Sequence, residues 1–527
     1  MNKGKDVKID RISEEDVELP LLASVPLSYA RGNMLMPLRR ENGDFLVGAV
    51  SGQEGVFALF DLAREMSLKP KALWGDKAVV LEAINRYYGQ LGSAKEVMAD
   101  IREDDLSSVA TEFERPKDIL ELTEEAPIIR LLNALLKQAM KDRASDIHIE
   151  PFEKELEVRI RVDGVLKKIL APPKIIQDAL VSRVKIMASL DIAERRLPQD
   201  GRIRLLVGGK DIDIRVSLIP TIHGERVVMR LLDRRGGSIG LTDLGMDEAM
   251  REQFDGLLSR QNGIILVTGP TGSGKTTTLY AALRKIFSEE KNIVTIEDPV
   301  EYELSGIGQI QINPKVGLTF ASGLRSILRQ DPDVIMVGEI RDLETAQIAI
   351  QASLTGHLVL STLHTNDAAS AITRLIDIGV EPFLVASSLA GVLAQRLVRR
   401  NCSYCSAPYE SAPSGAALAP DALIMQNALL AQNKDAAGIK ASRGRGCERC
   451  GGSGYLGRAG IFEFLDVVPS IRKLITERAD AKSIAEKAIS EGMRTLRMDG
   501  LLKVSTGLTT PEEVFRVTQK DDAGVQV

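Results

Sequence analysis

The chain has 527 residues, of which 44% are hydrophobic and 27% charged, and its formal net charge is −5. This length is too great for one hydrophobic core and predicts three or four domains, while the negative charge gives no support to a nucleic-acid partner. Residues 1–20 lack the apolar segment of a signal peptide, and the longest apolar stretch, Phe383–Leu393, is too short to span a bilayer. We therefore expect a cytoplasmic protein that touches a membrane only through partners.

The first 92 residues predict a small α/β domain, because short apolar runs alternate there with amphipathic segments. The expected elements are strands at Leu35–Leu38 and Phe45–Val50 and helices at Phe60–Met66 and Asp76–Gly89. No catalytic constellation occurs in this stretch, so we interpret residues 1–92 as an N-terminal docking domain. Residues 93–117 are highly charged and predict a flexible linker.

A second domain is expected over residues 118–238. Pro127 opens a helix whose apolar residues recur at helical spacing. The apolar period then changes to two in Leu156–Val162 and again in Ile212–Leu218, and Asp163-Gly164 predicts a hairpin turn. The domain should therefore contain an antiparallel sheet with one polar face rich in arginines. For any single arginine there, a solvated surface position is the simplest interpretation.

Residues 239–400 contain the most specific motif, an apolar strand from Gly263 that runs into a glycine-rich turn. Gly269, Gly274, Lys275 and Thr276 fit G-x-x-x-x-G-K-[ST], the phosphate-binding loop of nucleotide hydrolases. The glycines let successive N–H groups face one anion, Lys275 would reach the β- and γ-phosphates, and the Thr276 hydroxyl would hold Mg²⁺. We expect ATP or GTP to be bound by Gly269, Pro270, Thr271, Gly272, Ser273, Gly274, Lys275, Thr276 and Thr277.

Two further apolar strands in this domain end in acidic residues. One ends in Glu297 and Asp298, and the other ends in Glu339. Ligands of open α/β sheets bind beyond the carboxyl ends of the strands, so these carboxylates should converge on the γ-phosphate. One can hold Mg²⁺ through water while another orients the attacking water. A third strand has a histidine near each end, His357 and His364, and we expect both to serve the nucleotide site.

Four cysteines are arranged as two C-x-x-C pairs, Cys402 with Cys405 and Cys447 with Cys450. Such paired knuckles favour a tetrahedral Zn²⁺ site over four unliganded thiols. The spacer between the pairs is longer than in most zinc ribbons, which indicates an inserted loop within residues 401–460. Residues 461–527 predict a helical subdomain, and Thr510-Pro-Glu-Glu513 predicts a capping box at its last helix.

Taken together, these motifs resemble the ATPase family of type II secretion and type IV pilus assembly, and within it most closely the general secretion pathway E group. The matching segments are the Walker A loop Gly269–Thr276, the Asp box Ile296–Tyr302, the atypical Walker B Asp333–Glu339, the His box Thr355–Thr365, and the stretches Ala144–Pro151, Arg195–Arg202 and Gln395–Leu397. The resemblance runs from about residue 120 to the C-terminus and is weaker over the first 90 residues.

The resemblance implies a hexameric ATP-driven motor with a RecA-like P-loop domain, a preceding PAS-like α+β domain, a zinc-binding insertion and a small N-terminal docking domain. It implies that Glu297 is the catalytic acid/base and that Glu339 supports Mg²⁺. The arginines that it places around the phosphates or at subunit contacts are Arg215, Arg230, Arg325, Arg329, Arg341 and Arg458. It implies peripheral attachment to the inner membrane through a GspL-like platform protein bound by residues 1–92, with a GspF-like platform protein as a further partner.

Three alternatives to a secretion motor follow from the residues. A pilus-extension or competence ATPase has the same chemistry and a different partner. A DNA or RNA translocase needs a basic channel with aromatic stacking, which 4% aromatic residues and a negative charge do not favour. A non-catalytic scaffold does not require Lys275, Glu297 and Glu339 together.

Overall fold

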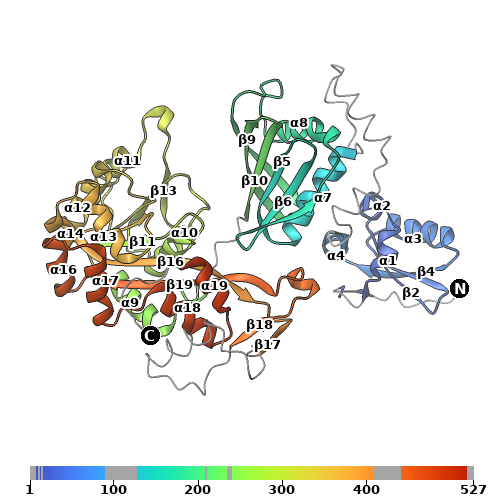
Figure 1. Cartoon of the computed structure of the whole chain (residues 1–527). Helices are drawn as coiled ribbons and strands as arrows, with labels where there is room; N and C mark the ends of the chain where they lie inside the picture. The colour runs from blue at the N-terminus through green and yellow to red at the C-terminus, as the bar shows by residue number, and fades with distance from the viewer. Residues whose placement is uncertain are drawn as a thin grey trace. The chain divides into compact units, whose positions relative to one another are not determined.

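A computed structural model describes residues 8–9, 12–13, 16–25, 27–88, 127–207, 210–233, 240–408 and 441–518. The chain divides into two compact units, Met1–Arg234 and Arg235–Val527 (Figure 1). Within the described ranges, no helix has both the length and the apolar character that crossing a membrane requires. The expected linker at 93–117 and most of the segment between the cysteine pairs, 409–440, lie outside the described residues.

The N-terminal part of the first unit is a four-stranded sheet in the order β1-β4-β3-β2 with helices around it. Its elements are β1 (Lys8–Ile9), α1 (Leu19–Ala23), α2 (Leu27–Gly32), β2 (Leu35–Glu41), β3 (Phe45–Val50), α3 (Gln53–Glu65), β4 (Lys69–Gly75) and α4 (Lys77–Tyr88). All four elements expected in this stretch from the sequence are present. Apolar residues on the two faces of the sheet form separate clusters, one with Ile84 of α4 and one with Leu59 of α3.

The rest of the first unit is an antiparallel six-stranded sheet in the order β7-β6-β5-β10-β9-β8. Its elements are α7 (Pro127–Lys141), β5 (Ala144–Pro151), β6 (Leu156–Val162), β7 (Val165–Leu170), a 3₁₀ turn (Lys174–Ile176), α8 (Gln177–Met187), β8 (Gln199–Val207), β9 (Lys210–Thr221) and β10 (Gly224–Asp233). Both helices cover one face, where Leu135 and Leu180 meet Ile147 of β5. The alternating residues of the strands form the opposite face, which is polar.

The second unit is built on a seven-stranded sheet in the order β13-β12-β14-β15-β11-β16-β19, parallel except for the last strand. Its strands are β11 (Gly263–Thr268), β12 (Ile293–Glu297), β13 (Gly308–Gln311), β14 (Val334–Val337), β15 (Leu358–Leu363), β16 (Leu389–Asn401) and β19 (Tyr455–Asp466), with the separate hairpin β17 (Ser406–Pro408) and β18 (Ser442–Gly444). Its helices are α9 (Glu248–Leu258), α10 (Lys275–Ile286), α11 (Phe320–Ile327), α12 (Leu343–Leu354), α13 (Ala368–Asp377), α14 (Pro382–Ser388), α16 (Pro469–Thr476), α17 (Ala481–Ser490), α18 (Leu496–Ser505) and α19 (Pro511–Val517).

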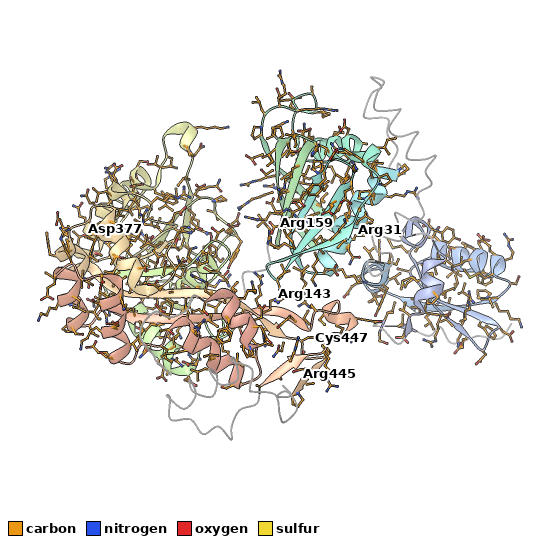
Figure 2. All side chains as sticks on the ribbon, in the orientation of Figure 1. Arg31, Arg143, Arg159, Asp377, Arg445 and Cys447 are labelled. Atoms are coloured by element: carbon orange, nitrogen blue, oxygen red, sulfur yellow. The ribbon has the colours of Figure 1, made fainter. Side chains whose placement is uncertain are left out.

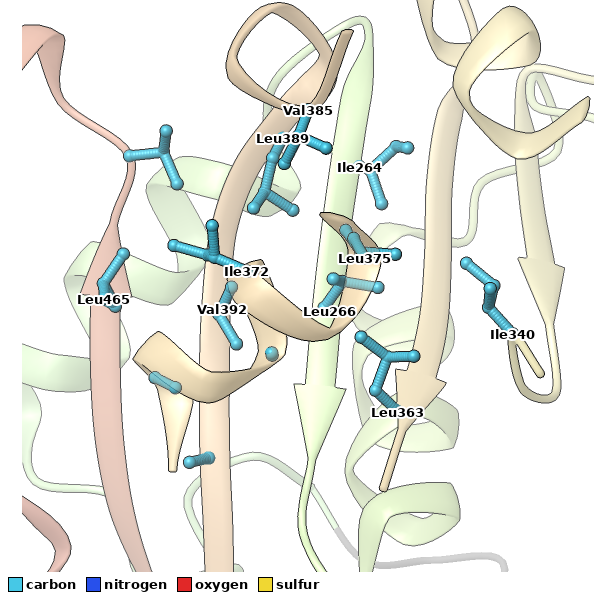
Figure 3. Packing of buried hydrophobic residues seen from close by; sticks show 14 of the residues in the cluster. Ile264, Leu266, Ile340, Leu363, Ile372, Leu375, Val385, Leu389, Val392 and Leu465 are labelled. Atoms are coloured by element: carbon cyan, nitrogen blue, oxygen red, sulfur yellow. The ribbon is translucent and has the colours of Figure 1, made fainter. Parts of the chain in front are cut away.

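Helices cover this sheet on both faces, which explains why its strands are continuous apolar runs. In β11, Ile264 and Leu266 belong to one core cluster and Ile265 and Val267 to the other. Figure 3 shows α13 crossing the first face, with its Ile372 and Leu375 close to side chains of β11 and β16. Because each strand is fixed on both sides, the loops at its carboxyl end start from a rigid edge.

The chain returns to this sheet after the cysteine pairs. β19 lies antiparallel to β16, with Gly391 opposite Asp466 and Asn401 opposite Tyr455. The C-terminal helices, red in Figure 1, pack on these strands and on neighbouring helices, α18 on β19, α19 on β16, and α16 on α14. The segment that contains the cysteine pairs and the β17–β18 sheet is therefore an insertion between β16 and β19 of the main sheet.

The capping box expected at Thr510-Pro-Glu-Glu513 does not form, although Thr510 is the N-cap of α19 and Pro511 its first residue. The Thr510 hydroxyl lies 2.9 Å from the Tyr455 hydroxyl instead. The Glu513 carboxylate accepts bonds from Arg399 of β16 at 2.5 Å and from Arg516 at 2.8 Å. Tertiary partners thus outcompete the local cap and fix the last helix to the main sheet.

Candidate nucleotide and metal sites

The phosphate-binding loop lies between β11 and α10, as the motif predicts. Gly269, Gly272 and Gly274 have φ of 149°, 80° and 91°, a region that residues with a Cβ rarely adopt. A Cβ on Gly269 would lie 2.5 Å from the Gln395 carbonyl and 2.6 Å from Ser273 Oγ, so the loop starts in direct contact with β16. The backbone then turns into α10, whose N-terminus is a ready anion site.

Lys275, the first residue of α10, is 9% exposed. Its Nζ donates to the carbonyls of Gly269 at 2.8 Å and Pro270 at 3.1 Å. Burial lowers the pKa of Lys275 to about 8, the Glu339 charge opposes this shift, and the Arg396 charge adds to it. Pro270, Thr271, Gly272 and Thr276 are exposed, Thr277 is half-buried, and Ser273 is buried. The loop therefore presents its open side to solvent with a buried cation behind it.

Glu339 and His364 meet at the same edge of the sheet as this loop. Because β14, β15 and β11 are parallel, with Val337 opposite Ser361 and Leu363 opposite Thr268, the residues that follow them are neighbours. The His364 Nε2 lies 3.2 Å from a Glu339 carboxylate oxygen, and Arg341 forms an ion pair with the other oxygen. That hydrogen bond from Arg341 to Glu339 raises the pKa of Arg341, and the nearby Asp298 charge contributes further.

Glu297 ends β12 but is 3% exposed, and donors occupy both of its carboxylate oxygens. The Thr295 hydroxyl donates at 2.6 Å, the Gln309 amide donates at 3.1 Å, and the Tyr280 hydroxyl donates to the second oxygen. Burial first, and then Glu297 itself, raise the pKa of Tyr280. In this arrangement the Glu297 carboxylate is enclosed by side chains, whereas Asp298 after it is exposed.

The partners of Glu297 were not identified from the sequence. One of them, Tyr280, also connects Glu297 to Glu301. The backbone N–H of Glu301 donates to the Tyr280 hydroxyl at 3.3 Å, and Glu301 itself is half-buried. A sequence signal existed, since Glu301 is a second glutamate in the segment that contains Glu297 and Asp298. Tyr280 lies in the middle of α10, and nothing in the sequence marked it as a partner of Glu297.

Three of the expected nucleotide residues lie away from the phosphate loop within this unit. His357 precedes β15, so the whole strand, roughly 20 Å long, separates it from the loop edge. Its Nδ1 lies 2.8 Å from the Ala352 carbonyl. Arg325 forms an ion pair with Glu344 of α12, and Arg329 donates to the Arg325 carbonyl at 2.9 Å. His357 is thus not part of the phosphate site of its own chain, and the two arginines belong to the α11–α12 surface.

Arg215 and Arg230 belong to the polar sheet face of the first unit, directly opposite each other on β9 and β10. Arg230 is 58% exposed and donates to Asp146 at 2.8 Å. Burial opposes ionisation of Asp146, but the hydrogen bonds from Arg230 and Ser145 and the charge of Arg230 more than offset it and lower the pKa of Asp146. Buried Asp146, His148 and Glu150 line the middle strand of this face, and Figure 2 labels Arg159, which pairs with Glu150 at 2.5 Å. The face is therefore a network of acidic and basic side chains.

The four cysteines form one cluster. The sulfurs of Cys402 and Cys447 and those of Cys405 and Cys450 are both 3.9 Å apart, and all four ligand atoms lie within 4.8 Å of one another. A tetrahedral ion with metal–sulfur bonds of about 2.3 Å separates its sulfurs by about 3.8 Å, so the cluster has the dimensions of a four-thiolate metal site. Figure 2 labels Cys447 on the segment that follows β18.

The backbone around the cluster is built for close approach. A Cβ on Gly444 would lie 1.9 Å from the Gly454 carbonyl, and one on Gly454 would lie 2.4 Å from the Gly444 carbonyl. Burial favours the neutral Cys450 thiol, but N–H groups of Cys447 and Gly454 donate to its sulfur and lower its pKa to about 6. This thiol is thus prepared to bind a cation as thiolate.

Comparisons with known proteins identify the family of the chain. The model of the family described as "Type II/IV secretion system protein" matches residues 121–516. The chain is 53% identical to the type II secretion system ATPase E of Vibrio cholerae over 82% of this chain and 84% of the relative, and 43% identical to the type IV pilus assembly ATPase PilB of Myxococcus xanthus over 99% and 90%. The structure of the Legionella pneumophila ATPase DotB shares the fold, with a TM-score of 0.53 and 21% identity over 76% of this chain and 96% of that one. The chain belongs to the type II/IV secretion system protein family and is a RecA-like P-loop ATPase.

Proposed function

We propose that this chain is the ATP-hydrolysing motor that powers pseudopilus assembly and protein export in a type II secretion system. The observation that carries the proposal is the phosphate loop, with buried Lys275 and the Glu339–His364 pair at one edge of a parallel sheet. The 53% identity to an ATPase named for type II secretion supports the choice of system. We infer ATP as the nucleotide, Mg²⁺ as its counter-ion, and a cytoplasmic location with peripheral attachment to the inner membrane.

At the phosphate loop we assign each role by position. Backbone N–H groups of residues 271–277 would bind the phosphates, Lys275 would leave its two carbonyl partners for the β- and γ-phosphates, and Thr276 would hold Mg²⁺. Glu339 would support the ion through water, oriented by His364 and Arg341. The bound ion supplies charge neutralisation at the phosphates.

The acid/base role calls for a carboxylate that can reach a water. The family resemblance implies that Glu297 has this role, but its oxygens are enclosed by three donors. We propose instead that Glu297 is a positioning residue that fixes Tyr280, and that Tyr280 holds the backbone of Glu301. Glu301 would then accept the proton of the attacking water, with exposed Asp298 close to Arg341.

Arg215 and Arg230 are proposed to stabilise the charge of the transferred phosphoryl group after the first unit closes on nucleotide, within one chain or across a hexamer contact. Arginines in this role accelerate phosphoryl transfer by roughly 10³–10⁵. Mixing K275A with R230A subunits separates the two cases, because recovered activity requires each subunit to complete the other's site. Arg325 and Arg329, which lie away from the phosphate loop of their own chain, are proposed as subunit contacts, and Arg341 and Arg458 as further phosphate or subunit contacts.

The four cysteines are proposed to hold one structural Zn²⁺, because a closed four-thiolate set leaves no position for water or substrate.

Residues 1–92 are proposed to bind a GspL-like inner-membrane platform protein, with a GspF-like protein as a second contact. A docking role is supported because the described part of residues 1–92 contains no glycine-rich phosphate-binding loop like that at Gly269–Thr276. Deleting residues 1–92 should leave ATP hydrolysis intact and abolish membrane association, whereas retained association would place the docking surface on the motor.

A pilus-extension motor is the second candidate, and one observation favours it. The type IV pilus assembly ATPase of Myxococcus xanthus matches 99% of this chain, although at a lower identity of 43%. Expression in strains that lack either their secretion ATPase or their pilus-extension ATPase distinguishes the two. Restored export supports the secretion motor, and restored surface pili without export supports the pilus motor.

A further inference from the structure

Arg396, on β16, is a buried cation beside the phosphate loop that none of the roles above uses. It is 8% exposed, although arginine is rarely buried without partners. A Cβ on Gly269 would lie 3.2 Å from its Nη1, which places the guanidinium against the first residue of the loop. Gln395 beside it accepts a bond from the Thr278 hydroxyl of α10 at 2.6 Å, so the two residues support both ends of the loop.

The same guanidinium contacts a second segment of the site. Its Nη2 donates to the backbone carbonyl of Asn366 at 2.8 Å and to the Asn366 side-chain oxygen at 3.2 Å, while Nη1 donates to the Gln395 carbonyl at 3.1 Å. Asn366 lies in the turn after β15, two residues from His364. One planar side chain therefore packs against the start of the phosphate loop and donates to the turn that follows His364.

A second contact secures this turn from the other side. The backbone N–H of Thr365 donates to the Thr268 hydroxyl at 3.0 Å, and the two hydroxyls are 2.7 Å apart. Thr268 is the last residue of β11, directly before Gly269. Arg396 and Thr268 both bond to the turn at Thr365 and Asn366. A displacement of the phosphate loop should therefore move this turn, and with it His364 and its partner Glu339.

We propose that Arg396 is a positioning residue that couples nucleotide occupancy of the phosphate loop to the placement of His364 and Glu339. The inference rests on the proposed ATP hydrolysis at this loop and adds a residue to it. Lysine cannot replace the arginine fully, because an ammonium group has no planar fork that reaches two carbonyl groups at fixed angles. Arg396 contacts the turn at Asn366 and not the phosphates, so it acts on turnover by positioning this turn. ATP binding by the phosphate loop depends little on Arg396.

The test uses the full-length chain with R396Q, R396K, H364A and the double variant R396Q/H364A, and with R400Q on the exposed Arg400 of the same strand as the matched control. We expect R396Q to lower kcat about tenfold while the Kd for ATP changes by less than about threefold. The double variant should be no slower than H364A, because both changes break one connection. R396K should recover part of kcat, and R400Q should match the wild type.

Wild-type kcat in R396Q would overturn the inference, as would a double variant whose loss is the product of the two single losses. If R396Q does not fold, R396K carries the same comparison in combination with H364A. An equal fall of ATP affinity, kcat and thermal stability in R396K would reduce Arg396 to a packing role. If the wild-type chain itself does not hydrolyse ATP, the proposed function fails, and this failure is distinct from the others.

Discussion

The His364 imidazole Nε2 lies 3.2 Å from the Glu339 carboxylate, across the carboxyl ends of the neighbouring strands β14 and β15. Glu339 also pairs with Arg341 and acts on the charge of Lys275. The Glu339 carboxylate is thus contacted by two basic side chains from loops, while its charge also acts on Lys275. The orientation of the Glu339 carboxylate therefore depends on His364 and Arg341.

His364→Ala should lower kcat by roughly 10–100-fold, because an oriented carboxylate beside a metal loses function when its second partner is removed. His357→Ala is the matched control, since that histidine lies at the opposite end of β15 and its ring bonds to Thr355 and the Ala352 carbonyl at the end of α12. Steady-state ATP hydrolysis measures both. Equal losses in the two variants would show that the histidines act through the stability of the strand.

Glutamine substitutions separate the roles of Glu301 and Glu297. Glu301→Gln should slow hydrolysis by about 10²–10⁴ with ATP affinity retained, the size expected for loss of a general base. Glu297→Gln should lower the melting temperature and reduce kcat less, because it disturbs the bonds to Tyr280, Thr295 and Gln309. The reverse order, an inactive E297Q beside a fully active E301Q, would return the base assignment to Glu297.

The phosphate loop could be predicted completely from the sequence, because its glycines and Lys275 serve a local backbone geometry. Strands β11, β14 and β15 were also recognisable, since burial on both faces makes them apolar throughout. The return of β19 to the main sheet was not, because β16 and β19 are separated by the cysteine segment and no local signal encodes their pairing. The surroundings of Glu297 were missed for the same reason, since Gln309 reaches it from another strand.

Misassigned positions share one cause, namely that local patterns ignore tertiary partners. The Thr510–Glu513 pattern fits a capping box, yet Glu513 is engaged by Arg399 from the main sheet. His357 resembles His364 in its strand-end position, but the parallel register places the two at opposite edges. The contact between Arg396 and Asn366 could not be predicted from the sequence, because the two residues are 30 positions apart.

The cysteine cluster predicts one zinc per chain by elemental analysis, and Cys447→Ser should lose the metal and lower the melting temperature. Ser403→Ala, in the exposed turn between Cys402 and Cys405, is the control that should keep both. ATP affinity should be unchanged in both variants, because the cluster lies on the insertion between β16 and β19. Folded protein with four titratable thiols and no metal would exclude the site.

Glu513 predicts a pH dependence of stability. Its burial opposes ionisation, but bonds from Arg399 and Arg516 more than offset this and lower its pKa to about 2. Since the folded pKa lies below the unfolded value of about 4.5, the ionised carboxylate stabilises the fold by roughly 3 kcal/mol at neutral pH, and this contribution is lost as the pH falls from about 4.5 towards 2.

Glu513→Gln should therefore lower the melting temperature at pH 7, and the difference from the wild type should narrow between pH 5 and pH 3, about the range where the unfolded carboxyl titrates. Glu512→Gln, the exposed neighbour in the same first turn, is the control and should leave the melting temperature nearly unchanged at both pH values. A difference for E513Q that stays constant over this range would mean that its charge does not carry the stabilisation.

We propose that ATP hydrolysis at the loop containing Lys275 powers protein export. The most direct measurement is export in a strain that lacks its secretion ATPase, complemented with the wild-type chain or with Lys275→Ala at equal protein levels, alongside ATP hydrolysis by the purified proteins. We expect the wild type to hydrolyse ATP and restore export and K275A to do neither, since no other side chain in the loop supplies a cation to the β- and γ-phosphates. Export restored by K275A without hydrolysis would show that hydrolysis at this loop does not power export.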